Sequence, residues 1–102
     1  VDGVPLIIFC CGWRELSPER LAEFGKRDAT YSLVVSHDLS SMDFNRARPF
    51  LDPMAYAGRL VRREDGWYFI GFTNMVDGEF VGELCDAVPV TADAELGLIR
   101  RD

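Results

Sequence analysis

The sequence predicts an all-β fold made of two consecutive antiparallel units of the kind that form the blades of a β-propeller. Asp-Gly pairs stand at Asp2-Gly3, Asp65-Gly66 and Asp77-Gly78, each before a run rich in β-forming residues. Asp-Gly favours the tight type I′ turn of a β-hairpin. The segment 2–9 also aligns with the segment 65–72, so one hairpin unit is repeated along the chain.

Turn residues divide the chain into seven expected strands. We interpret residues 1–53 as an incomplete blade and residues 54–102 as the last blade of a propeller. The expected strands cover residues 4–13, 30–36 and 46–51 in the first unit, and 56–62, 67–73, 80–85 and 96–100 in the second. A single β-sandwich, in which the likeness of the two hairpins is a coincidence, is the alternative interpretation.

One short helix interrupts the first unit. Ser17 is a good N-cap, Pro18 suits the first helical position, and Gly25 can end the helix. Leu21 and Phe24 form its apolar side, which predicts a surface helix inside a long connection.

Composition and charge exclude several classes of protein. Hydrophobic residues make up 48% of the 102 residues and aromatic residues 12%, which is too much apolar material for a disordered segment. The formal net charge is −6, and such a surface repels nucleic-acid phosphates. The longest apolar run, residues 6–11, is far below the roughly 20 residues that span a bilayer. We therefore expect no nucleic-acid partner and no membrane span.

The three cysteines form neither a metal-binding spacing nor a dense disulfide framework. Cys10 and Cys11 are adjacent in an expected strand, so their side chains should point to opposite faces, and we interpret them as small buried hydrophobic residues. Reduced thiols indicate a cytoplasmic protein. We expect no cofactor and no metal site.

The order of several segments resembles the end of a known enzyme fold. The segment 30–36 followed by Asp38-Leu39 resembles the ending of blades in five-bladed propeller glycosidases. Tyr56-Ala57-Gly58-Arg59-Leu60-Val61, the Asp65-Gly66 turn and the strand 67–72 are similar to the last blade of glycoside hydrolase family 32. That family contains the β-fructosidases, such as invertases, levanases and inulinases, and the resemblance covers residues 1–74.

The resemblance implies a retaining hydrolysis of sucrose or fructan-type carbohydrates, which needs two carboxylates about 5–5.5 Å apart. The family's Asn-Asp-Pro-Asn, Arg-Asp-Pro and Glu-Cys motifs are absent here, and Leu51-Asp52-Pro53 carries only the Asp-Pro. The catalytic Asp and Glu would lie upstream of Val1, so we predict that this chain has no catalytic residue and is inactive alone. Related propeller families that act on arabinosides or xylosides remain open.

Two residues are candidates for substrate binding. The first strand of each propeller blade lines the central channel, which in this chain is the strand 56–62. Tyr56 and Arg59 can offer a phenol and a fixed cation to a sugar or to a catalytic carboxylate. The alternative is that Tyr56 packs between blades and Arg59 forms a structural ion pair. Likewise, Trp13 can stack on a sugar ring or pack, and the single histidine, His37, is more typical of a turn than of a catalytic site.

The sequence is compatible with two functions. The chain is either the closing part of a glycosidase, where it completes the propeller and the rim of the pocket, or a non-catalytic β-rich module for binding or self-association. In both cases apolar blade faces and an unpaired edge strand should be exposed. We therefore expect the fragment to form a homo-oligomer.

Overall fold

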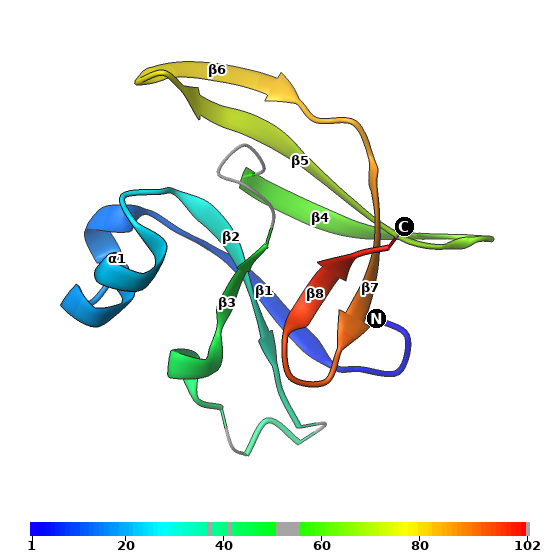
Figure 1. The fold of residues 1–102 in the computed structure, drawn as a ribbon. Helices are drawn as coiled ribbons and strands as arrows, with labels where there is room; N and C mark the ends of the chain where they lie inside the picture. Colours follow the sequence, from blue (N-terminus) through cyan, green and yellow to red (C-terminus); the bar gives the residue numbers. More distant parts are fainter. Residues whose placement is uncertain (37, 41, 51–55, 102) are drawn as a thin grey trace.

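The chain folds into two antiparallel sheets and one short α-helix (Figure 1). The structure is a computed structural model, and it describes residues 1–36, 38–40, 42–50 and 56–101. The first sheet has the strand order β1-β2-β3, from β1 (Leu6–Cys11), β2 (Ala29–Val34) and β3 (Arg48–Phe50). The second has the order β4-β5-β7-β8, with β6 paired to β5. Its strands are β4 (Tyr56–Arg63), β5 (Gly66–Val76), β6 (Glu79–Leu84), β7 (Val88–Asp93) and β8 (Gly97–Arg100). The predicted β-rich fold is confirmed.

Two of the three Asp-Gly pairs form the turn that the sequence predicts. Asp2 and Gly3 have φ values of 48° and 82°, and Asp77 and Gly78 have 52° and 81°, as a type I′ turn requires. The second of these turns joins β5 to β6. At Asp65-Gly66 only the glycine has a positive φ, 131°, and the hairpin between β4 and β5 turns at residues 64–65 instead.

The strand β7 was missed by the sequence analysis, which joined residues 80–85 directly to residues 96–100. Pro89 lies inside β7, and a proline normally argues against a strand because it has no N–H to donate. Here Pro89 stands opposite Tyr68 of β5. The 11-residue strand β5 thus pairs with β7 along its first half and with β6 along its second half.

The predicted helix forms as α1 (Pro18–Phe24). The Ser17 hydroxyl accepts a hydrogen bond from the Arg20 amide, Pro18 is the first helical residue, and Gly25 ends the helix with a φ of 79°. Two single 3-10 turns, η1 (Trp13–Glu15) and η2 (Phe44–Arg46), flank the first sheet. Within the described ranges, each helix is too short to cross a membrane.

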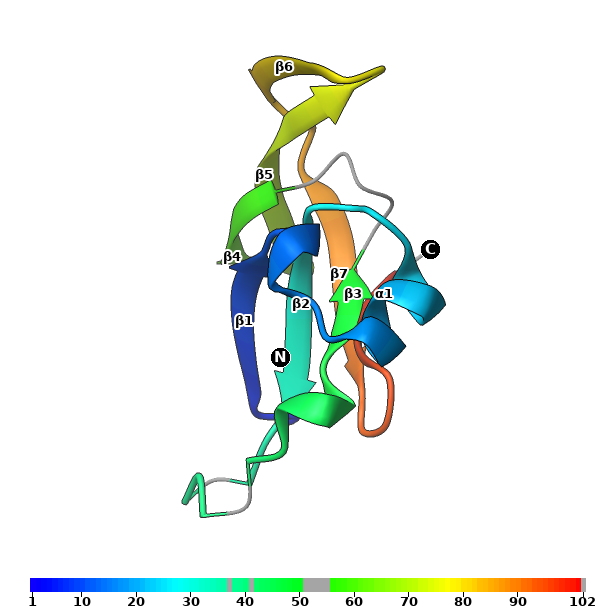
Figure 2. The same cartoon turned by 90° about the vertical axis from the view of Figure 1, so that its left-hand side faces the viewer.

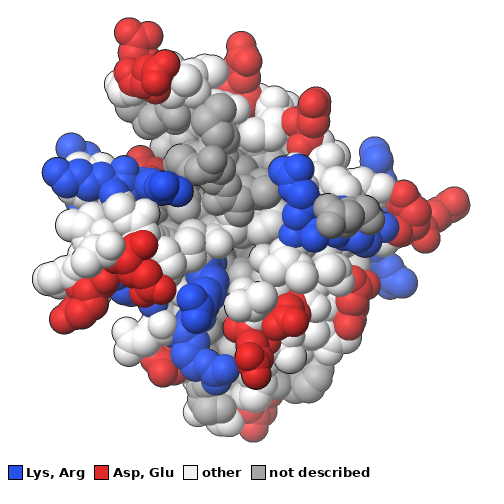
Figure 3. All heavy atoms as spheres, viewed as in Figure 1, with Lys and Arg blue, Asp and Glu red and all other residues white. Residues whose placement is uncertain are grey.

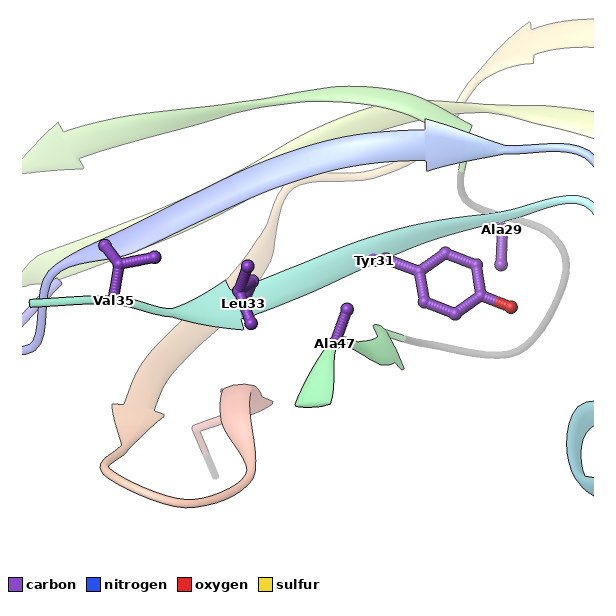
Figure 4. Packing of buried hydrophobic residues seen from close by; sticks show 5 residues of the cluster. All are labelled: Ala29, Tyr31, Leu33, Val35 and Ala47. Atoms are coloured by element: carbon purple, nitrogen blue, oxygen red, sulfur yellow. The ribbon is translucent and has the colours of Figure 1, made fainter. Parts of the chain in front are cut away.

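The first core lies between β2 and α1. Ala29, Tyr31, Leu33 and Val35 alternate along one face of the β2 segment, and Ala47 approaches them from the other side (Figure 4). Phe24 of α1 meets the Tyr31 ring edge to face, with ring centroids 6.0 Å apart. The helix therefore covers one face of the first sheet.

The second core lies between the two sheets. Phe50 of β3 meets Phe69 of β5 edge to face at 5.0 Å, and both are buried with Val90 and Leu98. On the inner face of β2, the Ser32 hydroxyl accepts a buried hydrogen bond of 2.9 Å from the Leu98 amide of β8. Because residues of both sheets share this core, the two halves form one folded unit.

The strands of the first sheet, taken in their order across the sheet, contact strands of the second sheet in the same order. β1 lies against β4, β2 lies against both β4 and β8, and β3 lies against β8. The hairpin of β5 and β6 projects beyond this stack, as the second view shows (Figure 2). This order places the amino end of β4 beside the carboxyl end of β1.

We predict that Ser32→Ala lowers the free energy of unfolding by about 1–3 kcal/mol, because the buried Leu98 N–H loses its acceptor. Urea denaturation of the purified chain measures this loss. Ser36→Ala is the control, since within the described residues its hydroxyl bonds the exposed carboxylate of Asp38, and its effect should stay within about 0.5 kcal/mol. Equal effects of the two substitutions would show that the contact between the sheets does not depend on this bond.

Candidate functional site

A β-bulge lies at the amino end of the strand β4. Tyr56 pairs with Phe72 and Arg59 pairs with Ile70, so two residues, Ala57 and Gly58, stand opposite one on β5. Ala57 has a φ of 51°, which is unusual for a residue other than glycine, and its amide donates to the Cys10 sulfur at 3.0 Å. Bulges of this kind are frequent beside active sites because they redirect side chains.

Gly58 is required by the packing beneath the bulge. A Cβ atom at this position would lie 2.0 Å from the Phe69 ring, and Phe69 is fully buried. A glycine inside a strand pattern indicates a bulge or close packing, so the sequence alone could have predicted the bulge at Gly58. The buried ring of Phe69 therefore fixes the backbone that carries Tyr56.

Tyr56 begins a row of aromatic side chains across three strands. Its ring meets Phe72 of β5 edge to face at 5.8 Å, and Phe72 meets Phe80 of β6 at 6.5 Å. Burial raises the pKa of the Tyr56 phenol, and the charges of Cys10 and Asp28 raise it further. The phenol thus stays protonated well into the alkaline range and can donate a hydrogen bond.

Arg59 lies on the other side of the bulge and is exposed. Together with Phe9, Cys10 and Thr30 it lines a hollow of about 180 Å³ between β1 and β4. Within the described residues Arg59 makes one long hydrogen bond, of 3.5 Å, to the carbonyl of Gly58. Its guanidinium keeps donors available for a ligand.

Asp28 connects the two sheets at the same end of the molecule. One carboxylate oxygen accepts a hydrogen bond from the Trp13 amide at 3.0 Å, and the other accepts from the Asn74 side chain of β5 at 3.2 Å. These residues line a groove of about 470 Å³. The negative charge of Asp28 is also one of the causes that raise the pKa of the Tyr56 phenol.

The structure brings Tyr56 and Arg59 to one end of β4, where Tyr56 belongs to the aromatic row and Arg59 lines the hollow between β1 and β4. The interpretation of Cys10 as a buried residue is wrong, because it is exposed at the bulge, while Cys11 is half-buried. Sequence analysis missed Asp28 and Asn74, which meet only through the packing of the sheets. His37 and the Leu51-Asp52-Pro53 segment lie outside the described residues.

The arrangement can bind a polar ring, but the described residues that line the groove include no pair of carboxylates. Asp28 is the one carboxylate among them, and both of its oxygens already accept hydrogen bonds. Retaining glycoside hydrolysis needs a nucleophile and a separate acid/base. In the described part of the chain, no group of three or more His, Cys, Asp or Glu side chains is arranged to hold a metal ion.

In comparisons with known proteins, the chain matches no family model, no curated protein and no solved structure.

We predict that Gly58→Ala lowers the free energy of unfolding by about 1–3 kcal/mol or more, because the new methyl group overlaps the Phe69 ring. Gly12→Ala is the matched control: Gly12 has a φ of −76°, and its nearest neighbour would be 3.4 Å away. The control should lose no more than about 0.5 kcal/mol. Thermal and urea denaturation compare the two variants, and a Gly58→Ala protein as stable as the control would contradict the account of the bulge.

Proposed function

We propose that the chain is the closing part of a β-propeller glycoside hydrolase of the β-fructosidase kind, family 32, and forms part of its sugar-binding pocket. In this proposal residues 1–53 and 54–102 belong to two adjacent blades. The substrate is a sucrose or fructan-type carbohydrate, and the parent protein is the enzyme.

The observation that carries the proposal is the matching order of strands in the two sheets. Propeller blades pack face to face, with inner strands beside inner strands and outer strands beside outer strands. Here β1 lies against β4 and β3 lies against β8, which supports an inner side at β1 and β4 and an outer side at β3 and β8. In such an assembly β4 lines the central channel.

The amino end of β4 has the properties of a sugar-binding wall. Aromatic rings pack well against the apolar face of a sugar, while polar groups fix its hydroxyls. Tyr56 and Phe72 supply the rings, and the protonated phenol of Tyr56 and the exposed guanidinium of Arg59 supply donors. Tyr56 and Arg59 are thus the proposed binding residues.

The proposal assigns the chemistry to carboxylates of upstream blades. A cation such as Arg59 beside the pocket would favour the ionised form of a nucleophilic carboxylate. Cys10 and Cys11 carry free thiols, which supports the proposed cytoplasmic location.

We predict that the chain binds fructose weakly, with a dissociation constant on the order of millimolar, because it provides one wall of the pocket. Amide and side-chain chemical shifts in an NMR titration would identify Tyr56 and Arg59 as contacts. Tyr56→Phe should weaken binding several-fold. Tyr68→Phe is the matched control, because Tyr68 donates its hydroxyl proton to Asp65 at the far end of β4.

The same purified chain should release no fructose from sucrose, inulin or levan. Turnover that disappears when one carboxylate of this chain is changed would overturn the assignment of catalysis to upstream blades. Absence of any fructose-induced shift near β4 would overturn the role in the pocket.

The exposed strand β6 favours a second candidate, a module for self-association. Phe80 and Leu84 are 68% and 80% exposed, and the described part of β6 pairs only with β5. An apolar strand with a free edge is a template for pairing with another chain. A second copy of this chain would satisfy both the apolar side chains and the edge.

We predict that the isolated chain forms a homo-oligomer whose stability depends on β6. Sedimentation equilibrium should show association that weakens at least tenfold in the double variant Phe80→Ser/Leu84→Ser. The control double variant Leu39→Ser/Leu96→Ser removes two side chains that are 53% and 52% exposed elsewhere, and it should associate like the parent chain. A compact monomer at high concentration would exclude the oligomer.

A further inference from the structure

The second sheet has two free edges that carry charges of opposite sign. Phe72 of β5 pairs with Tyr56 of β4 on one side and with Leu84 of β6 on the other, so β4 and β6 lie at opposite edges. In the described part of the chain, each of these two strands pairs only with β5. An unpaired strand edge is a template for a strand of another chain.

The edge at β6 is acidic and apolar. Glu79 and Glu83 lie on either side of Val81 in this strand, and all three residues are exposed. Acidic side chains lie along the upper border of the molecule, where Figure 1 shows β6 (Figure 3). The sequence has no lysine or arginine between Arg63 and Arg100, so β5, β6 and β7 contribute no cation that offsets this charge.

The edge at β4 carries cations in the same order. Arg59 and Arg63 lie on either side of Val61, and these three residues are also exposed. The Arg63 guanidinium lies 5.1 Å from the centroid of the Tyr68 ring, a contact that leaves its N–H donors available. Both edges therefore present a valine between two charged residues, with positive charges on β4 and negative charges on β6.

Carboxylates at the end of β4 offset part of its charge. Asp2 and Glu64 line a hollow together with Arg62 and Arg63, so charges of both signs meet there. The described residues that line the hollow with Arg59 include no carboxylate. The strand β4 therefore keeps a net positive charge, and the excess lies toward the bulge.

The other edge strands fit β6 less well. The strand β1 carries no charged side chain, and β3 is three residues long with Arg48 in an ion pair with Glu23 at 3.7 Å. The strand β8 has four residues, of which Gly97 and Leu98 are buried. Among the described strands, β4 is therefore the free edge that combines length, exposure and positive charge.

We propose that β4 of one copy adds to β6 of the next copy, so that the chain self-associates head to tail. This inference rests on the second candidate function, self-association, and adds the surface that covers β6. A symmetric pair of β6 strands would instead place Glu79 and Glu83 beside the same residues of the second copy, and like charges on paired strands are destabilising. A head-to-tail contact leaves one β4 and one β6 free in each dimer, so association continues beyond the dimer.

The test compares charge variants of the purified chain by sedimentation equilibrium at one ionic strength. Glu79→Gln/Glu83→Gln should weaken association about fivefold, because the attraction to β4 is lost. Glu19→Gln/Glu95→Gln is the matched control, since it removes the same charge from exposed positions outside both edges, and it should associate like the parent chain. Symmetric pairing of β6 predicts the opposite result, which is stronger association of the first variant.

A charge exchange identifies β4 as the second edge. Arg59→Glu/Arg63→Glu and Glu79→Arg/Glu83→Arg should each lose association on their own, because the two edges then carry the same sign. An equimolar mixture of these two variants should recover association, and so should a single chain with all four substitutions. Thermal denaturation of each variant shows whether it remains folded.

Association of Glu79→Gln/Glu83→Gln at or above the level of the control would overturn the head-to-tail arrangement and leave self-association standing. A mixture that stays as dissociated as its two components would overturn the arrangement too, because β4 would not be the complementary edge. A chain that is monomeric in every form would overturn both this inference and the second candidate function.

Discussion

The fold depends on β2 being buried on both faces. Tyr31 and Leu33 are buried in the core on one face, where Phe24 of α1 packs on Tyr31, and the alternate residues Thr30 and Ser32 face the second sheet. A strand in this position must satisfy its polar side chains inside the protein, and the hydrogen bond between Ser32 and the Leu98 amide does so. The helix, the first sheet and the second sheet are therefore layers around one strand.

The candidate site follows from this layered arrangement. Stacking the sheets brings the end of β1 to the start of β4, where the bulge directs the Ala57 amide to the Cys10 sulfur instead of to β5. The same stacking brings Asp28 and Asn74 together across the two sheets. One end of the molecule thus collects an aromatic row, the exposed guanidinium of Arg59 and the groove that Asp28 and Asn74 line.

Local signals in the sequence predicted much of the secondary structure, because their physics is local. Ser17, Pro18 and Gly25 define the helix through capping, and Asp77-Gly78 defines a hairpin through its positive φ angles. The strand with Pro89 was missed because its pairing with β5 outweighs the usual penalty for proline in a strand. Asp28 and Asn74 are 46 residues apart, and only the packing of the two sheets makes them partners. Gly58 indicates the bulge in the sequence, and the structure gives the reason: the Phe69 ring leaves no room for a side chain at this position.

The division of β5 between two partners separates the molecule into parts of different local stability. Its first half is held between β4 and β7 around the buried Phe69, whereas β6 is exposed along its length and is attached through the second half of β5. Elements with few buried contacts open with a small free energy, independently of global unfolding. Opening of β6 would move Phe80, the outer ring of the aromatic row, and leave Tyr56 and Phe72 in place. A ligand of varying length could then be accommodated at one end of the row by a segment that adjusts its position while the core stays intact.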